Sequence, residues 1–147
     1  MSADEFYREM ENTLRESGEF GMDEIPLTIF MLLAKPRTRL KAGEISNITK
    51  LSRSYVYNAL NSLMGRGIVI ATTERPMKYY IHSVPKVISG LRRQHEETGR
   101  QHEETAKNFL ALERLAANLK KKGLLDEEIE SPKNIFLPYL RIELGKW

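Results

Sequence analysis

The sequence contains no cysteine, and this excludes disulfide bonds, thiolate metal sites and cysteine nucleophiles. It also lacks an apolar run near the roughly 20 residues that a helix needs to span a bilayer. The longest such run, residues 25–34, is interrupted by Pro26. The N-terminal segment is acidic and has neither the basic nor the apolar region of a secretory signal. These absences predict a cytoplasmic protein that makes no membrane contact.

The chain has 147 residues, of which 41% are hydrophobic and 29% are charged, so it can bury a core of ordinary size. The net charge of +3 is unevenly distributed. Residues 20–86 carry ten basic and four acidic side chains, whereas residues 1–19 carry two basic and six acidic ones. The excess of positive charge in the central block predicts an anionic partner for that block.

An amphipathic helix is predicted over residues 4–17. Phe6, Met10 and Leu14 recur every four residues and therefore lie on one face of this helix. A stripe of this kind indicates packing, either against the next domain or against a partner subunit.

Three further helices and a β-hairpin are predicted in the basic block. The helices occupy about 24–35, 43–49 and 53–66, and two β-rich runs follow at 68–72 and 77–82. In the short middle helix we expect Ile45 and Ile48 to point inward. Because the junction before the last helix is tight, this segment has the outline of a winged helix-turn-helix. The expected fold class is mainly α with a small β-hairpin.

The helix over residues 53–66 has clear start, stop and core signals. Ser52 is a good N-cap, and Gly67 fits the left-handed position after the helix end. Val56, Leu60 and Leu63 follow the i, i+4, i+7 spacing of a buried face.

Residues 86–122 contain no proline and predict one long helix. The segment QHEETGR at 94–100 is followed directly by QHEETAK at 101–107, so seven residues are nearly duplicated. This spacing continues in both directions as a heptad repeat, which predicts a dimerising coiled coil, either parallel or antiparallel. The expected homodimer interface consists of Ile88, Leu91, His95, Thr98, His102, Thr105, Phe109, Leu112, Ala116 and Leu119.

Two motifs in the basic block are similar to those of a known family. The first is VY-x-x-L-x-x-L-x-x-x-G-x-V, carried by Val56, Tyr57, Leu60, Leu63, Gly67 and Val69, and the second is the wing RPMKYYIHSVP. Residues 22–85 thereby resemble the DNA-binding domain of the TrmB family of archaeal transcription regulators. The resemblance implies a winged helix-turn-helix with a coiled-coil helix directly after it. Full-length members also carry a sugar-sensing domain, for which the remaining residues are too few. We therefore expect neither a small-molecule effector nor a cofactor.

The predicted domains follow from these assignments. They are an N-terminal helical extension (1–20), a winged helix-turn-helix (21–85), a coiled-coil dimerisation helix (86–122) and a docked, apolar C-terminal tail (123–147).

The outward face of the helix over residues 53–66 is polar and contains no acidic side chain. Asparagine can bond bidentately to adenine in the major groove, and Ser, Tyr and Arg can contact phosphates. Basic side chains in the wing can reach the minor groove or its phosphates. The predicted DNA-contacting residues are Arg53, Ser54, Tyr55, Asn58, Asn61, Arg75 and Lys78.

Catalytic and metal sites find little support in the sequence. His95 and His102 are separated by about 10 Å along a helix, so one ion could not take both from the same chain. There is no phosphate-cradling glycine loop and no G-x-S-x-G motif. We therefore predict no enzymatic activity, no catalytic residue and no metal ligand.

The combined prediction is a homodimeric transcription regulator that binds double-stranded DNA sequence-specifically and is associated with the nucleoid. Two alternatives fit the same pattern. One is a winged-helix protein–protein interaction module, and the other is a sequence-blind, chromatin-type DNA-binding protein. Steep salt dependence of DNA binding is expected of the regulator and of the chromatin-type protein, and not of the interaction module.

Overall fold

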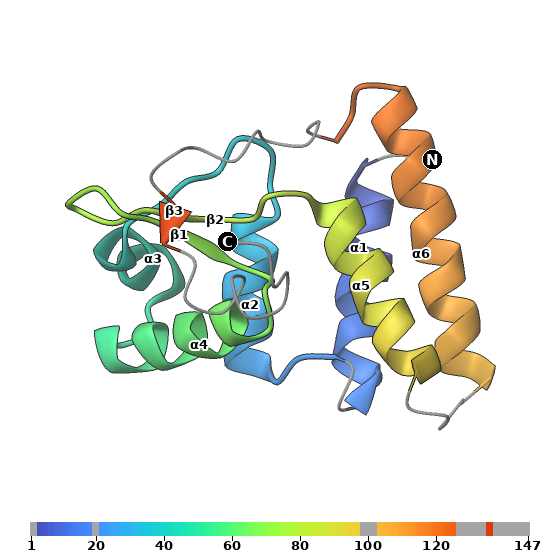
Figure 1. The fold of residues 1–147 in the computed structure, drawn as a ribbon, viewed down its shortest axis with the longest axis horizontal. Coiled ribbons are helices and arrows are strands. Elements are labelled where there is room, and N and C mark those ends of the chain that lie inside the picture. The colour runs from blue at the N-terminus through green and yellow to red at the C-terminus, as the bar shows by residue number, and fades with distance from the viewer. Residues whose placement is uncertain (1–2, 19–20, 98–102, 126–134, 137–147) are drawn as a thin grey trace. The chain divides into compact units, whose positions relative to one another are not determined.

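The computed structural model describes residues 3–18, 21–97, 103–125 and 135–136 (Figure 1). The helices are α1 (Ala3–Glu16), α2 (Glu24–Leu33), α3 (Ala42–Thr49), α4 (Arg53–Gly65), α5 (Val84–Glu97) and α6 (Glu103–Lys121). The strands are β1 (Ile70–Thr72), β2 (Tyr79–Tyr80) and β3 (Ile135–Phe136). The predicted fold class, mainly α with a small β-hairpin, is confirmed.

The chain divides into two compact units, and the division falls within α2. The helical unit contains α1, the first turn of α2, α5 and α6. The winged unit contains the rest of α2, α3, α4 and the sheet. None of the helices in the described residues is both long and apolar enough to cross a membrane.

The winged unit is built around α4, whose N-cap and buried face agree with the prediction. The Ser52 hydroxyl accepts a hydrogen bond from the backbone N–H of Tyr55 at 3.3 Å. On the opposite face of the helix Val56, Leu60 and Leu63 are fully buried. Gly67, with φ of 73°, takes the left-handed conformation after the helix end.

The sheet of the winged unit has three strands in the order β2-β1-β3. The hairpin pairs Ile70 with Tyr80, as expected for a wing. The third strand was not predicted: Ile135–Phe136 pairs antiparallel with β1, where Phe136 lies opposite Ala71. The remaining tail positions, 126–134 and 137–147, lie outside the described residues.

The inward orientation predicted for Ile48 is wrong. Ile45 is fully buried, but 56% of the Ile48 surface is exposed. With only eight residues, α3 has a buried face of little more than one turn, formed by Ala42 and Ile45. Ile48 lies in the last turn, beyond that face, so spacing alone did not predict its exposure.

The single helix predicted over residues 86–122 is also wrong. α5 ends at Glu97 and α6 begins at Glu103, and the two helices pack against each other (Figure 1). The guanidinium of Arg92 donates a hydrogen bond to the carboxylate of Glu113. In one straight helix these residues would be about 30 Å apart. The two helices therefore run antiparallel, as a helical hairpin within one chain.

The hairpin buries most of the predicted heptad seam. Seven of the ten positions are at most 3% exposed, namely Ile88, Leu91, His95, Phe109, Leu112, Ala116 and Leu119. Thr105 is half-buried, while Thr98 and His102 lie outside the described residues. A heptad pattern shows that a helix face needs a helical partner, but not whether that partner belongs to the same chain. This is why the pattern did not predict the hairpin.

Helix α1 completes the helical unit. Its stripe of Phe6, Met10 and Leu14 is at most 1% exposed, and α1 packs on α6 of the same chain. At its end, Arg15 Nε lies 2.6 Å from Glu24 Oε1. This hydrogen-bonded guanidinium lowers the pKa of Glu24.

Candidate DNA interface

All seven residues predicted to contact DNA have exposed side chains in the winged unit. Five of them belong to α4 and two to the hairpin that joins β1 to β2. The buried face of α4 fixes the rotation of this helix, so its polar face is directed to solvent. The structure thus places the predicted side chains where a nucleic acid could reach them.

Arg53 occupies the first turn of α4 and extends across the start of α3. A Cβ built at Gly43 would lie 3.2 Å from Arg53 Nη2. The absence of a side chain at residue 43 therefore leaves room for the guanidinium. Arg53 brings a positive charge to the point where the two helices of the helix-turn-helix meet.

The electrostatic character of this region is positive. Residues 45–73 contain no Asp or Glu. Lys50, in the turn between α3 and α4, is exposed and has a left-handed backbone with φ of 65°. Arg66, at the end of α4, is half-buried, and this burial lowers its pKa. Of these flanking cations, Lys50 and Arg53 are therefore better exposed to an anion than Arg66 is.

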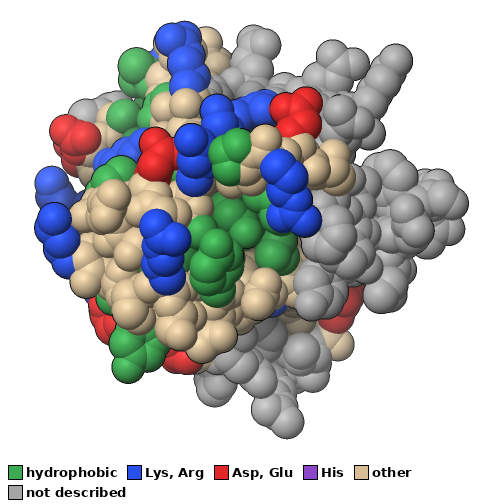
Figure 2. All heavy atoms as spheres, turned by 90° about the vertical axis from the view of Figure 1, so that its left-hand side faces the viewer, with side chains coloured by type: hydrophobic (Ala, Val, Ile, Leu, Met, Phe, Trp, Pro, Cys, Tyr) green, Lys and Arg blue, Asp and Glu red, His purple; other side chains and the backbone are tan. Residues whose placement is uncertain are grey.

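Three large hydrophobic side chains are exposed on the helix-turn-helix. They are Ile48 and Tyr55, each 56% exposed, and Tyr57, which is 46% exposed. Figure 2 shows Lys and Arg side chains distributed around hydrophobic side chains on one face of the molecule. Apolar side chains in this setting can contact thymine methyl groups, while tyrosine hydroxyls can bond phosphates.

Ile48 was missed as a candidate contact because it was expected to point inward, and Tyr57 because it was considered only as a member of the family motif. For Tyr57 the helical periodicity of the sequence did indicate exposure. Residue 57 is rotated by 100° from the buried Val56, which places it at the edge of the exposed face.

The wing holds its two predicted cations on a hydrogen-bonded hairpin. The backbone N–H of Lys78 donates to Thr72 Oγ1 at 3.0 Å, and the N–H of Thr72 donates to the carbonyl of Lys78 at 2.9 Å. At the turn, Arg75 Nη1 contacts Met77 Sδ at 3.0 Å. The Arg75 and Lys78 side chains themselves remain exposed.

The basic segment before α3 is tied to the wing. Leu40 and Tyr79 exchange two backbone hydrogen bonds, of 3.1 and 2.7 Å. Arg39 lies over the ring of the buried Tyr80, 4.4 Å from its centroid. Burial raises the pKa of Tyr80. Lys41 and Lys78 are the neighbours of these two bridged residues, and both lysine side chains are exposed. The pairing of Leu40 with Tyr79 was not predicted.

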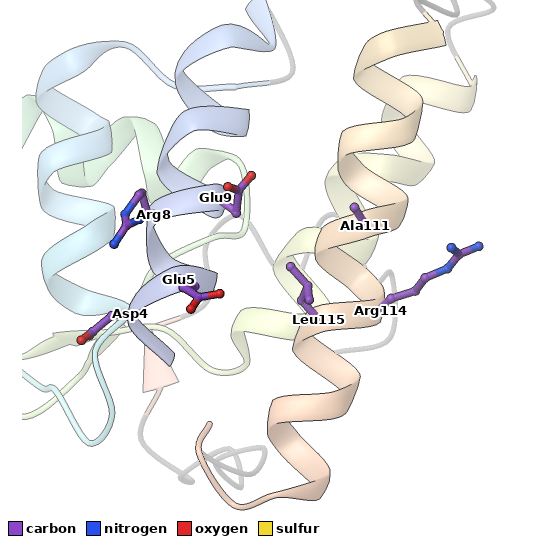
Figure 3. A pocket seen from close by; sticks show the side chains of 7 residues that line it. All are labelled: Asp4, Glu5, Arg8, Glu9, Ala111, Arg114 and Leu115. Carbon is purple, nitrogen blue, oxygen red and sulfur yellow. The ribbon is translucent and has the colours of Figure 1, made fainter. Parts of the chain in front are cut away.

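A separate groove lies in the helical unit between α1 and α6 (Figure 3). Its volume is about 740 Å³, and it is lined by Asp4, Glu5, Arg8, Glu9, Ala111, Arg114 and Leu115. Glu5 and Glu9 extend from α1 toward α6, whereas Ala111 and Leu115 form an apolar wall on α6 (Figure 3). Within the described part of the chain, no group of three His, Cys, Asp or Glu residues could hold a metal ion. The groove is not part of the candidate DNA interface.

Residues 17–84 match the model of the family described as "Sugar-specific transcriptional regulator TrmB". The expected resemblance to this family is thereby confirmed for residues 17–84. A search of curated proteins found no significant match. The description of this family is that of a transcriptional regulator, and the matched residues include all of α3, α4 and the wing.

Proposed function

We propose that the chain is a sequence-specific regulator that binds double-stranded DNA as a homodimer, with α4 in the major groove and the wing near the minor groove. The observation that carries this proposal is the exposed face of α4. It is polar and free of acidic residues, lies beside two exposed cations and belongs to the region matched by the regulator family. Occupancy of such a site on the chromosome would control transcription.

Each group of side chains has a chemical role in the proposal. Asn58 and Asn61 lie in the middle of the exposed face of α4 and read base edges, since an amide can bond adenine bidentately. Arg53, Ser54 and Tyr55, in the first turn, bond the phosphate backbone. The wing cations, Arg75 and Lys78, neutralise phosphates beside the minor groove.

The homodimer is proposed to form through residues 86–122. A protein that reads two half-sites needs a dimer with fixed geometry, and the heptad repeat of this region supplies a suitable helix surface. Most of the heptad seam is buried within one chain, so a dimer can form in one of two ways. Either the two chains exchange helices and each seam is completed by the other chain, or the chains join through another surface of the same helices.

Selection of bound duplexes from a random pool, followed by footprinting, tests the proposal. An enriched palindrome with fixed half-site spacing is expected, together with affinity that falls steeply with salt. A salt slope without an enriched site would indicate sequence-blind binding. No retention on duplex DNA at low salt would favour the protein–protein interaction module.

A further inference from the structure

The paired residues of α5 and α6 lie at nearly equal distances along the sequence on either side of one point. Arg92 pairs with Glu113, and the rings of His95 and Phe109 lie 6.4 Å apart. Both pairs are centred near residue 102, at the junction of the duplicated segments QHEETGR and QHEETAK. Two identical chains crossing antiparallel at this point could make the same pairs between chains, each pair twice. An exchanged dimer would therefore keep both of these α5–α6 pairs.

Helix α6 is the element whose contacts can be exchanged in this way. Its partners in the helical unit, α1 and α5, are both joined in sequence to the winged unit. α6 follows them in the chain and presents to them one apolar face, formed by Phe109, Leu112, Ala116 and Leu119. A second copy of α6 has the identical face and can occupy the same place.

The sequence between the two helices supports an exchanged state. In the sequence, the heptad spacing continues from Ile88 to Leu119 without a change of register. A closed pair of antiparallel helices does not require the register of one helix to continue into the next. Two chains that cross antiparallel do require one continuous register, because the apolar face of each chain must then contact the other chain along the whole length of the two helices.

We propose that the homodimer forms by exchange of α6: the α6 helix of each chain packs on α1 and α5 of the other chain, in an antiparallel arrangement that preserves the Arg92–Glu113 and His95–Phe109 pairs. This inference rests on the homodimer of the proposed function and adds its form. The partner is a second copy of this chain, and the interface is formed by the buried seam residues of α5 and α6.

Because the chain has no cysteine, the exchange can be tested with introduced thiols. Arg92 and Glu113 are suitable positions, since they are in contact and their side chains are only 24% and 23% exposed. An Arg92→Cys chain is co-expressed with a Glu113→Cys chain and treated with a short bis-maleimide. A denaturing gel is expected to show a covalent heterodimer, since only exchange brings these positions together from different chains.

A matched control uses Arg15→Cys co-expressed with Glu24→Cys. These residues also form an ion pair, but the elements carrying them are not exchanged. The control is expected to give no covalent heterodimer. The Arg92→Cys/Glu113→Cys double variant should give covalent dimers, and the Arg15→Cys/Glu24→Cys double variant only links within one chain.

Two results would overturn the exchange. In the first, the Arg92→Cys/Glu113→Cys double variant is cross-linked only within each chain although sedimentation shows a dimer. This result would place the dimer interface elsewhere. In the second, sedimentation shows a monomer at all concentrations tested. This result would also contradict the homodimer of the proposed function. Retention of the uncross-linked protein on duplex DNA, measured in parallel, tests DNA binding independently of both results.

Discussion

Individual side chains on α4 and in the wing separate into two chemical classes. Asn58 and Asn61 carry amides that can donate and accept hydrogen bonds at base edges. Arg53 and Arg75 carry a permanent positive charge that suits phosphates. Since base contacts specify and phosphate contacts position, the two classes should give different binding phenotypes.

Asn58→Ala and Asn61→Ala are expected to change the preferred sequence, each costing about 1–3 kcal/mol on the original site. Arg53→Ala and Arg75→Ala should instead lower affinity on all duplexes. Repeating the duplex selection with each variant measures this, and Asn118→Ala, exposed on α6, is the matched control. If both α4 variants select the original sequence with the original affinity, the assignment of the reading face is wrong.

Lys50 has a conformation that its residue type disfavours. A side chain in the left-handed region costs roughly 1–2 kcal/mol, and glycine avoids most of this cost. We therefore expect Lys50→Gly to unfold at an equal or higher urea concentration than the wild type. The same change should weaken binding to every duplex, because the charge in the turn between α3 and α4 is lost.

Lys50→Asn separates the two effects, since asparagine tolerates the left-handed region and carries no charge. It should lower DNA affinity as much as glycine does. Unchanged affinity in both variants would show that Lys50 does not contact the phosphate backbone.

At the scale of elements, the sequence predicted those features that local chemistry determines. The cap at Ser52, the buried face of α4 and the left-handed Gly67 all depend on residues close together in the chain. The path of the chain after residue 97 depends instead on which helix covers the heptad seam, and the periodicity is the same for either choice. The pairing of Leu40 with Tyr79 joins segments nearly 40 residues apart and had no local signal.

The seam makes a direct prediction about stability. Phe109 is fully buried beside His95, so Phe109→Ala should lower the free energy of unfolding of the helical unit by about 3–5 kcal/mol. The adjacent Leu110 is 43% exposed, and Leu110→Ala should cost well under 1 kcal/mol. Urea unfolding followed by circular dichroism measures both. Similar losses in the two variants would mean that Phe109 is not a core residue of this unit.

At the scale of the whole molecule, the positive charge of the candidate DNA interface and the apolar heptad seam belong to different units. The exposed cations of the candidate interface lie in the winged unit, and the buried heptad positions lie in the helical unit. In the proposed regulator one unit therefore contacts DNA, while the other determines how many winged units bind together. The salt dependence of binding reports on both properties, because it counts the phosphates neutralised by the entire assembly.

Replacing one phosphate-contacting lysine in a homodimer removes two contacts, since the residue occurs in both chains. Each neutralised phosphate contributes about 0.9 to the slope of log affinity against log salt, so Lys78→Gln should reduce the magnitude of that slope by about 1.8. A monomer would lose only about 0.9.

Titration of the selected duplex at several salt concentrations measures the slope. Lys107→Gln is the control, because Lys107 lies on α6 within 3.6 Å of Glu103 and outside the interface, and its slope should equal that of the wild type. A loss near 0.9 would contradict the homodimer on DNA, and no loss would exclude Lys78 as a phosphate contact.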